Sequence, residues 1–166
     1  MISLEELDAV PVRHRETIPE EYRDEMGHMN VRWYVFLFSK GAMALFDTVG
    51  LDEQLRETAQ SGSFALSQFI QYRREVLIGQ DVRVHSHIVN RSDRRVHFVH
   101  YMVNETTSEL AATMEVLATH IDLSVRKSAP FPEDVAEKID REIAATRQLG
   151  WEPPLSGAIQ AQRAAK

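Results

Sequence analysis

The chain contains no cysteine, and this absence excludes several kinds of chemistry at once. Disulfide bonds, thiolate metal sites and cysteine nucleophiles are all ruled out. Positive charge is also scarce, because 19 Lys and Arg residues face 25 Asp and Glu residues, for a formal net charge of -6. Such a chain is a poor match for the phosphate backbone of nucleic acids, so no nucleic-acid partner is expected.

Long apolar runs are missing as well. No stretch reaches the roughly 18 apolar residues that a membrane-spanning helix needs, and the acidic residues 1–8 lack the apolar core of a secretory signal. We therefore expect a cytoplasmic protein without membrane contact. The 166 residues, 43% of them hydrophobic, are enough for one domain with a core of its own.

Residues 31–49 are apolar on almost every face. Asn30 is a favourable N-cap and Gly50 a favourable residue just beyond a helix end, so both ends of a helix are marked. The stretch is too long for a buried strand. A helix this apolar must be wrapped by other elements.

Residues 64–125 read as β-structure, because apolar and polar residues alternate along several stretches. Three turn-like breaks separate the predicted strands: residues 79–81, 90–94 and 104–108. A further short strand is expected within residues 10–18. Short turns between successive strands predict an antiparallel meander. Residues 132–149 have the spacing of an amphipathic surface helix, opened by Pro132.

The expected order is a strand, a long buried helix, four strands and an outer helix. A strongly curved antiparallel sheet wrapped around the apolar helix would bury its apolar side chains. This α+β arrangement is the hot-dog fold. We expect residues 1–150 to form one domain and residues 151–166 to form a tail anchored by Trp151. The edge strand of such a sheet predicts pairing with a second copy, as a homodimer or homotetramer.

A polar segment, Asp24 to Asn30, stands directly before the apolar helix. It combines a carboxylate, a glycine suited to a turn, a histidine and a helix-capping asparagine. Polar chemistry at the positive end of a core helix favours an enzyme that acts on an acyl group. The alternative interpretations are a solvated loop acid at Asp24 and a histidine, His28, that only fixes the turn.

The run Asp24-x-x-Gly27-His28-x-Asn30-x-x-x-Tyr34 resembles the signature of the hot-dog thioesterases of the 4-hydroxybenzoyl-CoA type. More narrowly, most of the chain is similar to the betainyl-CoA thioesterases of carnitine breakdown. The pieces that carry this likeness include Gln71-Tyr72-x-x-Glu75, His97-x-x-His100, Ala112-Thr113-x-Glu115 and Pro130-Phe131-Pro132. The resemblance implies an acyl-CoA thioester hydrolase whose expected substrate is betainyl-CoA or a similar short polar acyl-CoA.

The resemblance also favours Asp24 as the catalytic carboxylate, which would either attack the thioester carbonyl or activate a water. His28 is expected to orient Asp24 or to bond the carbonyl oxygen. Backbone N–H groups are free where a helix begins, so those of Asn30, Val31 and Arg32 are expected to hold the oxyanion. A well-aimed donor of this kind contributes about 2.7–4 kcal/mol.

A betainyl group carries a trimethylammonium, which aromatic faces hold well. Trp33, Tyr34 and Tyr72 are the candidates for this task, and ordinary core packing is the alternative for each ring. Glu75 would add negative charge, unless it pairs with one of the two arginines before it.

Arg91, Arg94 and Arg95 cluster in one predicted turn, which would suit the phosphates of coenzyme A. A solvated turn is the alternative. Coenzyme A enters as part of the substrate, so no separate cofactor is expected.

Four histidines lie on two neighbouring predicted strands: His85, His87, His97 and His100. His97 and His100 are three residues apart, so they point to opposite faces of a regular strand. Without a recognisable ligand spacing, no metal is expected. Polar or subunit-interface positions on the outer face of the sheet are the simpler interpretation.

Two other functions stay open on the same fold. One is a thioesterase for fatty or aromatic acyl-CoA, and the other is a non-catalytic acyl-CoA-binding protein. Asp24 argues against the second, because binding alone needs no carboxylate beside a thioester. A hot-dog dehydratase fits less well, since the Asp and His that it would need are not arranged in that family's pattern.

Overall fold

The computed structural model describes residues 2–159 and 161. Four helices and six strands follow one another along the chain, with one 3₁₀ turn, Glu20–Tyr22. The helices are α1 (Leu4–Asp8), α2 (Val31–Thr48), α3 (Glu53–Ala59) and α4 (Glu133–Arg147). The strands are β1 (Val12–Thr17), β2 (Ser61–Tyr72), β3 (Asp81–Arg91), β4 (Arg95–Asn104), β5 (Glu109–Asp122) and β6 (Lys127–Ser128).

All neighbouring strands are antiparallel, in the order β1-β3-β4-β5-β2, with β6 added to β5. The predicted meander is confirmed for β3, β4 and β5 but is wrong for β2, which pairs with β5. The strand ends at Tyr72, earlier than the alternation suggested, so residues 73–80 can cross the end of the sheet to β3. Arg73 and Arg74 begin this crossing, and both backbone N–H groups donate to Ala111.

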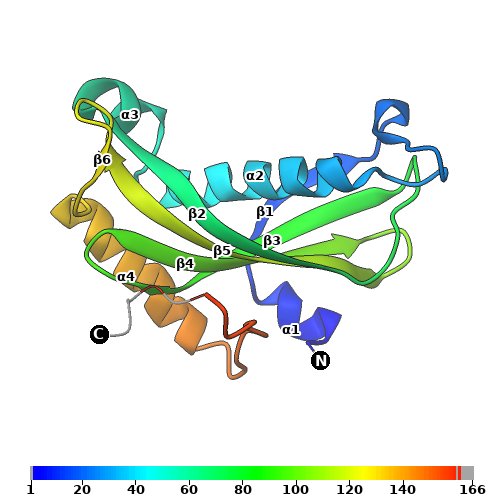
Figure 1. Cartoon of the computed structure of the whole chain (residues 1–166). Helices are drawn as coiled ribbons and strands as arrows, with labels where there is room; N and C mark the ends of the chain where they lie inside the picture. Colours follow the sequence, from blue (N-terminus) through cyan, green and yellow to red (C-terminus); the bar gives the residue numbers. More distant parts are fainter. Residues whose placement is uncertain (1, 160, 162–166) are drawn as a thin grey trace.

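The sheet curves around α2, and α1 lies on its opposite side (Figure 1). This is the predicted hot-dog arrangement. Helix α4 lies along β3, where Thr146 donates to the carbonyl of Ile88, and its buried apolar residues join the core cluster that contains α2. Asn30 caps α2 by accepting from the N–H of Arg32, and Gly50 follows the helix with a φ of +81°, as the sequence predicted. The short helices α1 and α3 were not predicted, because neither is long enough to show a clear apolar period.

Helix α2 is not enclosed on all sides, contrary to the prediction. It packs on β1, β3 and β4 through Leu37, Phe38 and Leu45, which are fully buried. On its other side Phe36 is 39% and Met43 56% exposed. The curved sheet covers only one face of the helix, so an apolar strip of α2 stays open to solvent in a single chain.

Gly41 is the point of closest approach between α2 and the sheet. A Cβ atom at this position would lie 2.8 Å from Cγ1 of Val84 and 3.3 Å from Oγ of Ser86. Both distances are shorter than ordinary van der Waals contact. The absence of a side chain at Gly41 therefore sets how near the helix lies to β3.

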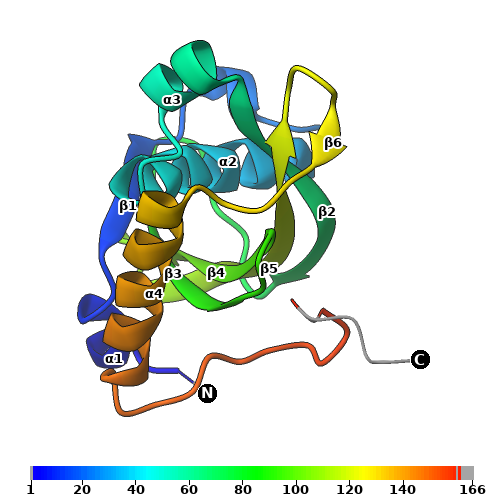
Figure 2. The same ribbon diagram turned by 90° about the vertical axis from the view of Figure 1, so that its left-hand side faces the viewer.

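The outer face of the sheet is covered by the two ends of the chain. Helix α1 and Trp151 pack in one apolar cluster with Val99, Tyr101 and Val103 of β4. Beyond Gly150 the described part of the tail runs along this face (Figure 2), so Trp151 anchors it as expected. The division of the chain at residue 150 stays a prediction.

No single helix in the described ranges is long and apolar enough to cross a membrane. Only α2 and α3 taken together meet those criteria, and they are bent by 68° relative to one another.

Two buried histidines are neutral in the folded protein. Burial lowers the pKa of His87 to about 4, and burial together with the nearby charge of His87 lowers the pKa of His100 to about 3. His87 lies on the outer face against Tyr101 and Trp151. His100 lies on the inner face, where it stacks on Phe38 and bonds Ser86. The expectation of an outer-face position is therefore wrong for His100. Its side chain points inward because successive residues of β4 face opposite sides of the sheet, and the neighbouring Val99 and Tyr101 face outward.

Protonation of these histidines should destabilise the fold in acid. Unfolded histidines bind protons below about pH 6.5, whereas the two buried rings do so only near pH 4 and below. The unfolded state thus holds more protons in this window, and the free energy of unfolding falls as the pH decreases through it. Each histidine contributes a slope of up to about 1.4 kcal/mol per pH unit, and neither contributes above about pH 7.

Urea unfolding of the wild type and of His100→Gln at a series of pH values between about 7.5 and 5 measures this slope. The variant should lose stability less steeply on acidification, whatever its stability at neutral pH. Identical slopes would contradict the assignment, because both proteins share all carboxylates.

Candidate active site

The loop before α2 is held in one shape by its own backbone. The N–H of Asp24 donates to the carbonyl of His28 at 2.9 Å, and the N–H of Gly27 donates to the carbonyl of Asp24 at 3.2 Å. Gly27 has a φ of +92°, which a glycine adopts without strain. Arg23 and Met29 pair across the loop, so it forms a closed turn that presents Asp24 and His28 together.

The side chains of Asp24 and His28 form an ion pair at the mouth of this turn. Nδ1 of His28 lies 3.1 Å from Oδ2 of Asp24, and the carboxylate is 17% exposed. The other oxygen, Oδ1, accepts from the N–H of Met26 at 2.8 Å. Nδ1 of His28 faces this carboxylate, which leaves the other ring nitrogen, Nε2, as the one available for a substrate or a water.

The beginning of α2 offers one free donor rather than the three expected. The N–H of Asn30 donates to Tyr22 at 2.8 Å, and that of Arg32 donates to the side chain of Asn30 at 3.1 Å. Within the described residues, the N–H of Val31 has no partner. Val31 is thus the helix residue whose amide can point at an oxyanion, and the prediction is corrected for Asn30 and Arg32.

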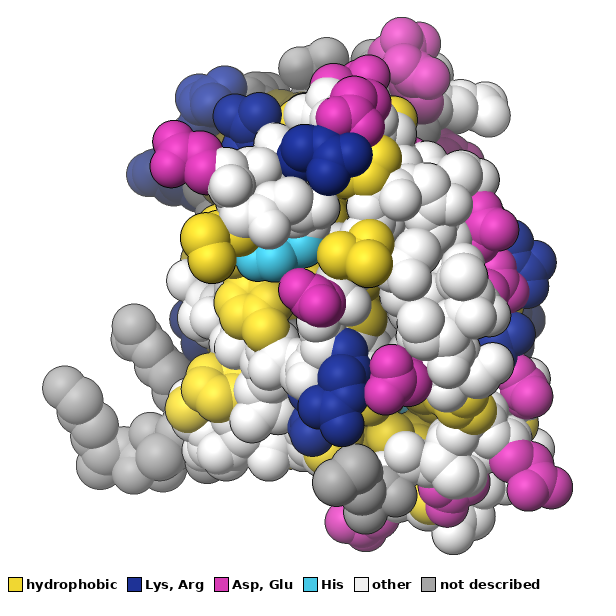
Figure 3. Space-filling view, turned by 90° about the vertical axis from the view of Figure 1, so that its right-hand side faces the viewer, with side chains coloured by type: hydrophobic (Ala, Val, Ile, Leu, Met, Phe, Trp, Pro, Cys, Tyr) yellow, Lys and Arg dark blue, Asp and Glu magenta, His cyan; other side chains and the backbone are white. Residues whose placement is uncertain are grey.

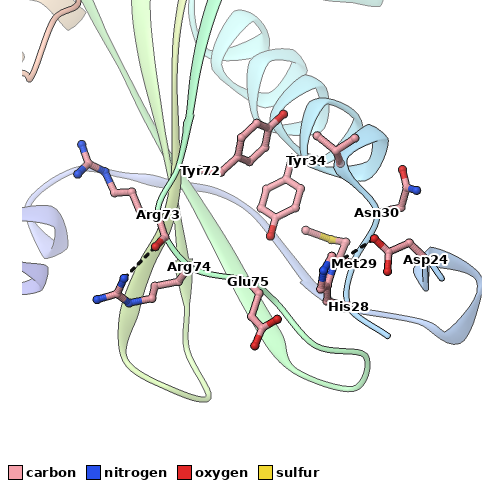
Figure 4. Close-up of a pocket in the computed structure, with 10 residues that line it drawn as sticks. Asp24, His28, Met29, Asn30, Tyr34, Tyr72, Arg73, Arg74 and Glu75 are labelled. Atoms are coloured by element: carbon pink, nitrogen blue, oxygen red, sulfur yellow. Dashed lines mark hydrogen bonds and ion pairs between the residues drawn. The ribbon is translucent and has the colours of Figure 1, made fainter. Parts of the chain in front are cut away.

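A cavity of about 400 Å³ opens beside this helix end. The loop, the first turn of α2 and the segment after β2 form its walls. The lining residues are Asp24, His28, Met29, Asn30, Val31, Tyr34, Tyr72, Arg73, Arg74 and Glu75. Figure 4 shows the side chains of Asp24 and His28 on one side of the cavity and Tyr72 and Arg73 on the other. On the surface, a histidine lies between hydrophobic side chains, with acidic and basic ones below it (Figure 3).

Two tyrosines form an aromatic wall of the cavity. The rings of Tyr34 and Tyr72 meet edge to face, with centroids 5.1 Å apart. Burial raises the pKa of Tyr34 to about 12, with smaller contributions from the charges of Glu75 and Asp24. Tyr34 is therefore a neutral hydroxyl at working pH, able to donate a hydrogen bond but not to act as a base.

Trp33 does not line the cavity, although the sequence proposed it with the two tyrosines. Its ring stacks on Tyr22 with centroids 3.8 Å apart, and it meets Phe36 edge to face. Trp33 and Tyr34 are consecutive residues of α2, so their side chains point about 100° apart around the helix axis. Tyr34 faces the cavity, and Trp33 faces Tyr22 and Phe36 instead. The structure thus brings two of the three predicted aromatic rings together.

Glu75 lies at the exposed rim of the cavity and forms no ion pair with Arg73 or Arg74. Those two arginines were noted in the sequence only as possible partners of Glu75, and the structure makes them part of the cavity wall. The signal that could have found them is their position directly after a strand that ends at the site.

Arg91, Arg94 and Arg95 lie at the other end of the sheet. Arg95 is opposite Thr119 on β5, whereas Tyr72 at the cavity is opposite Ala112, seven residues away along the same strand. At a rise of 3.2–3.4 Å per residue the separation is about 23 Å. Arg91 pairs with Asp140 and Arg94 with Asp93. A role of these three arginines in binding CoA stays a prediction, and one chain does not bring them to this cavity.

The remaining histidines form no metal cluster. Among the residues that the structure describes, no group of three or more His, Asp or Glu side chains is placed to hold an ion. His85 bonds the carbonyl of Val10, and His97 pairs with the buried Glu115 at 2.8 Å. The second oxygen of Glu115 accepts from the backbone of Ser156 in the tail.

Comparison with known proteins decides the family. A model described as the thioesterase-like superfamily matches residues 19–139, which include the loop, α2 and the cavity. The chain belongs to this superfamily. Helix α1 and the tail lie outside the matched residues. The prediction of a hot-dog thioester hydrolase is confirmed at this level.

The chain is also similar to two curated proteins whose names include a betainyl-CoA thioesterase. The chain is 28% identical to the betainyl-CoA thioesterase of Pseudomonas aeruginosa over 129 residues, which cover 78% of this chain and 81% of that protein. It is 27% identical to an L-carnitine dehydrogenase/betainyl-CoA thioesterase of Rhizobium meliloti over 70% of this chain, but this covers only 23% of that longer protein.

Solved structures show the same fold. A Staphylococcus aureus protein in complex with CoA has a TM-score of 0.77 and 25% identity, covering 88% of this chain and 96% of its own. A Thermus thermophilus thioesterase complexed with coenzyme A and Zn has a TM-score of 0.69 at 21% identity, covering 82% of this chain and 97% of its own.

Proposed function

We propose that this superfamily member hydrolyses betainyl-CoA, or a similar short cationic acyl-CoA, to the free acid and CoA. The observation that carries the proposal is the cavity that combines the Asp24–His28 pair and the free N–H of Val31 with two tyrosine rings and the Glu75 carboxylate. The identity to betainyl-CoA thioesterases over most of the chain supports the same substrate. The following steps assign each group a task.

The thioester carbonyl carbon is placed between Asp24 and the start of α2. A water loses a proton to the Asp24–His28 pair and adds its oxygen to this carbon, and the oxyanion accepts from the N–H of Val31. The C–S bond then breaks, the sulfur leaves as the CoA thiolate, and the acid is released. A thiolate is a good leaving group, so no strong general acid is needed.

Direct attack by Asp24 is the other route and would form an anhydride that water cleaves. One oxygen of Asp24 already accepts a hydrogen bond from the N–H of Met26, and the other lies 3.1 Å from Nδ1 of His28. Both contacts stabilise the negative charge of the carboxylate, which lowers its nucleophilicity and suits it to hold His28 or a water. We favour the water route for this reason. Hydrolysis in H₂¹⁸O under single-turnover conditions tests direct attack, because water that cleaves the anhydride at the Asp24 carbonyl carbon leaves one ¹⁸O atom in Asp24, whereas the water route never labels the enzyme.

The acyl group extends toward Tyr34 and Tyr72. A trimethylammonium is attracted by the faces of aromatic rings, by about 0.5–2 kcal/mol for each contact. Glu75 adds a negative charge at the same side of the cavity. A neutral acyl group of equal shape would gain the apolar contact with the rings but neither of the charge terms.

A thiol-release assay tests the substrate. Betainyl-CoA and 3,3-dimethylbutyryl-CoA have the same shape and differ only in the quaternary nitrogen, so the comparison isolates the charge. Betainyl-CoA should have the higher kcat/KM, by about a hundredfold, from two ring contacts of about tenfold each. Equal values would contradict the cationic substrate, and fatty or aromatic acyl-CoA would then be tried. Absence of hydrolysis with every thioester would leave the non-catalytic binding protein as the explanation.

We also propose that two copies pair through β2. This edge strand of the sheet exposes Phe64 (44%), Leu66 (49%) and Phe69 (41%), and it runs beside the open side of α2. A long apolar edge of this kind favours antiparallel pairing with a second copy. In such an antiparallel pair, the Ser61 end of one β2 lies beside the Tyr72 end of the other. The Arg91–Arg95 turn of one copy would therefore approach the cavity of the other.

Phe69→Lys is expected to convert the dimer to a monomer of 19.0 kDa, because it places a charge in the middle of the paired edge. Light scattering after size-exclusion chromatography measures the mass. Glu137→Lys on the exposed side of α4 is the control, and it should keep the wild-type mass. A monomeric wild type, or a Phe69→Lys variant that stays dimeric, would contradict this interface.

A further inference from the structure

A second cavity of about 560 Å³ lies next to the first and is not used by the steps above. Its walls come from α1 and the two residues before it, from the end of β2 and the segment that follows, and from the start of β5. The lining residues are Ile2, Ser3, Leu4, Tyr72, Arg73, Arg74, Glu109 and Leu110. Tyr72, Arg73 and Arg74 line both cavities. A long ligand can therefore occupy both by crossing these three residues.

The two arginines at this boundary leave a net positive charge. Arg74 pairs with Glu109 at 3.1 Å. Arg73 has no carboxylate partner in the described part of the chain, and its guanidinium bonds only the amide oxygen of Gln71 at 3.1 Å. Its Nε is buried and has no hydrogen-bond partner. A buried donor without a partner is costly, and a phosphate oxygen is the acceptor that an arginine binds best.

The rest of the cavity is mostly apolar. Ile2, Leu4 and Leu110 belong to the cluster that packs α1 on the outer face of the sheet, and the ring of Tyr72 is half exposed beside them. Asp8 ties the same helix to the sheet through an ion pair with Arg83 at 2.8 Å. An apolar wall next to an unpaired guanidinium matches a ligand with a flat heterocycle beside phosphates.

We propose that this second cavity binds the nucleotide end of the CoA thioester, with the phosphates on Arg73 and the adenine against α1. The inference rests on the proposed function, because it assumes that the acyl end occupies the first cavity. The pantetheine arm would then pass over Tyr72 and Arg73. Helix α1 lies outside the residues matched by the superfamily model, whereas Arg73, Arg74 and Glu109 lie inside them.

Steady-state kinetics with matched thioesters test the proposal. The acyl group that the wild type cleaves best is presented once on CoA and once on pantetheine, which lacks the nucleotide. Arg73→Gln should lower kcat/KM for the CoA thioester about tenfold or more, mainly through KM. The same variant should lose much less on the pantetheine thioester, because that substrate carries no nucleotide phosphate. Arg141→Gln, an exposed arginine on α4, is the matched control for lost charge.

Three outcomes would overturn the inference. The first is a wild type that cleaves both thioesters with the same KM. The second is an Arg73→Gln variant that is impaired equally on both. The third is a loss specific to the CoA thioester in Arg94→Gln instead, which would assign the phosphates to the turn after β3.

Binding of adenosine 3′,5′-bisphosphate, measured by calorimetry, separates this inference from the proposed function. The wild type should bind this nucleotide, and Arg73→Gln should bind it at least about tenfold more weakly. This result would support the cavity even if no tested thioester were hydrolysed. Equal binding by the two proteins would overturn the cavity assignment while leaving hydrolysis at Asp24 untouched.

Discussion

Asp24→Asn is expected to lower kcat for thioester hydrolysis by about 10²–10⁴-fold, the range that a positioned general base contributes. The amide keeps the shape of the carboxylate and can still accept from the N–H of Met26. It cannot take a proton, and it no longer holds a charge against Nδ1 of His28. Thiol release under saturating substrate measures the loss, and circular dichroism checks that the fold is retained.

His28→Gln is the companion of this variant. If Asp24 acts through His28, the two single variants and the double variant should be about equally slow, because residues that act as a unit are not additive. If Asp24 contacts the water itself, His28→Gln should be the milder change. Full activity in Asp24→Asn would contradict a catalytic role for the carboxylate under either route.

Tyr72→Leu should reduce the preference for a cationic acyl group about tenfold, measured as the ratio of kcat/KM for betainyl-CoA to that for 3,3-dimethylbutyryl-CoA. Leucine keeps the apolar contact but has no ring face to attract a quaternary nitrogen. Tyr72 is 49% exposed at the end of β2, so its replacement leaves no core cavity. Any effect on the CoA moiety is common to both substrates and cancels in the ratio.

Two further variants sharpen this experiment. Tyr72→Phe keeps the ring and should keep the ratio, so a loss as large as that of leucine would contradict the aromatic mechanism. Glu75→Gln removes charge without changing shape and should lower the ratio by a smaller factor, because this carboxylate lies at the solvent-exposed rim.

Local signals made α2 predictable to within a residue at each end. Asn30 and Gly50 are cap residues whose effect depends on the adjacent backbone alone, and the apolar run between them left no other assignment. Likewise, the Asp24–His28 pair could be anticipated because both residues belong to one short turn. Sequence-local chemistry therefore predicted a contact that the structure contains, and its role as the centre of the site stays a prediction.

The features that the sequence missed depend on contacts between distant segments. The pairing of β2 with β5 is set by how residues 73–80 cross the sheet, which no local pattern encodes. That crossing brings Arg73 and Glu75 to the cavity. The choice of Val31 as the free donor likewise depends on Tyr22, whose carbonyl occupies the N–H of Asn30. Predicting such details needs the tertiary fold first.

The close approach at Gly41 links the position of the whole of α2 to one contact with the sheet. Ten residues separate Gly41 from Val31, which at 1.5 Å per residue is about 15 Å of rigid helix. A methyl group at Gly41 would press on Val84 and force the helix to pivot about that point. Small displacements there would be transmitted along the helix to the N–H of Val31, the donor proposed for the oxyanion. A substitution at Gly41, far from the cavity, is therefore expected to misplace this donor and to slow the proposed reaction while the residues of the cavity stay unchanged.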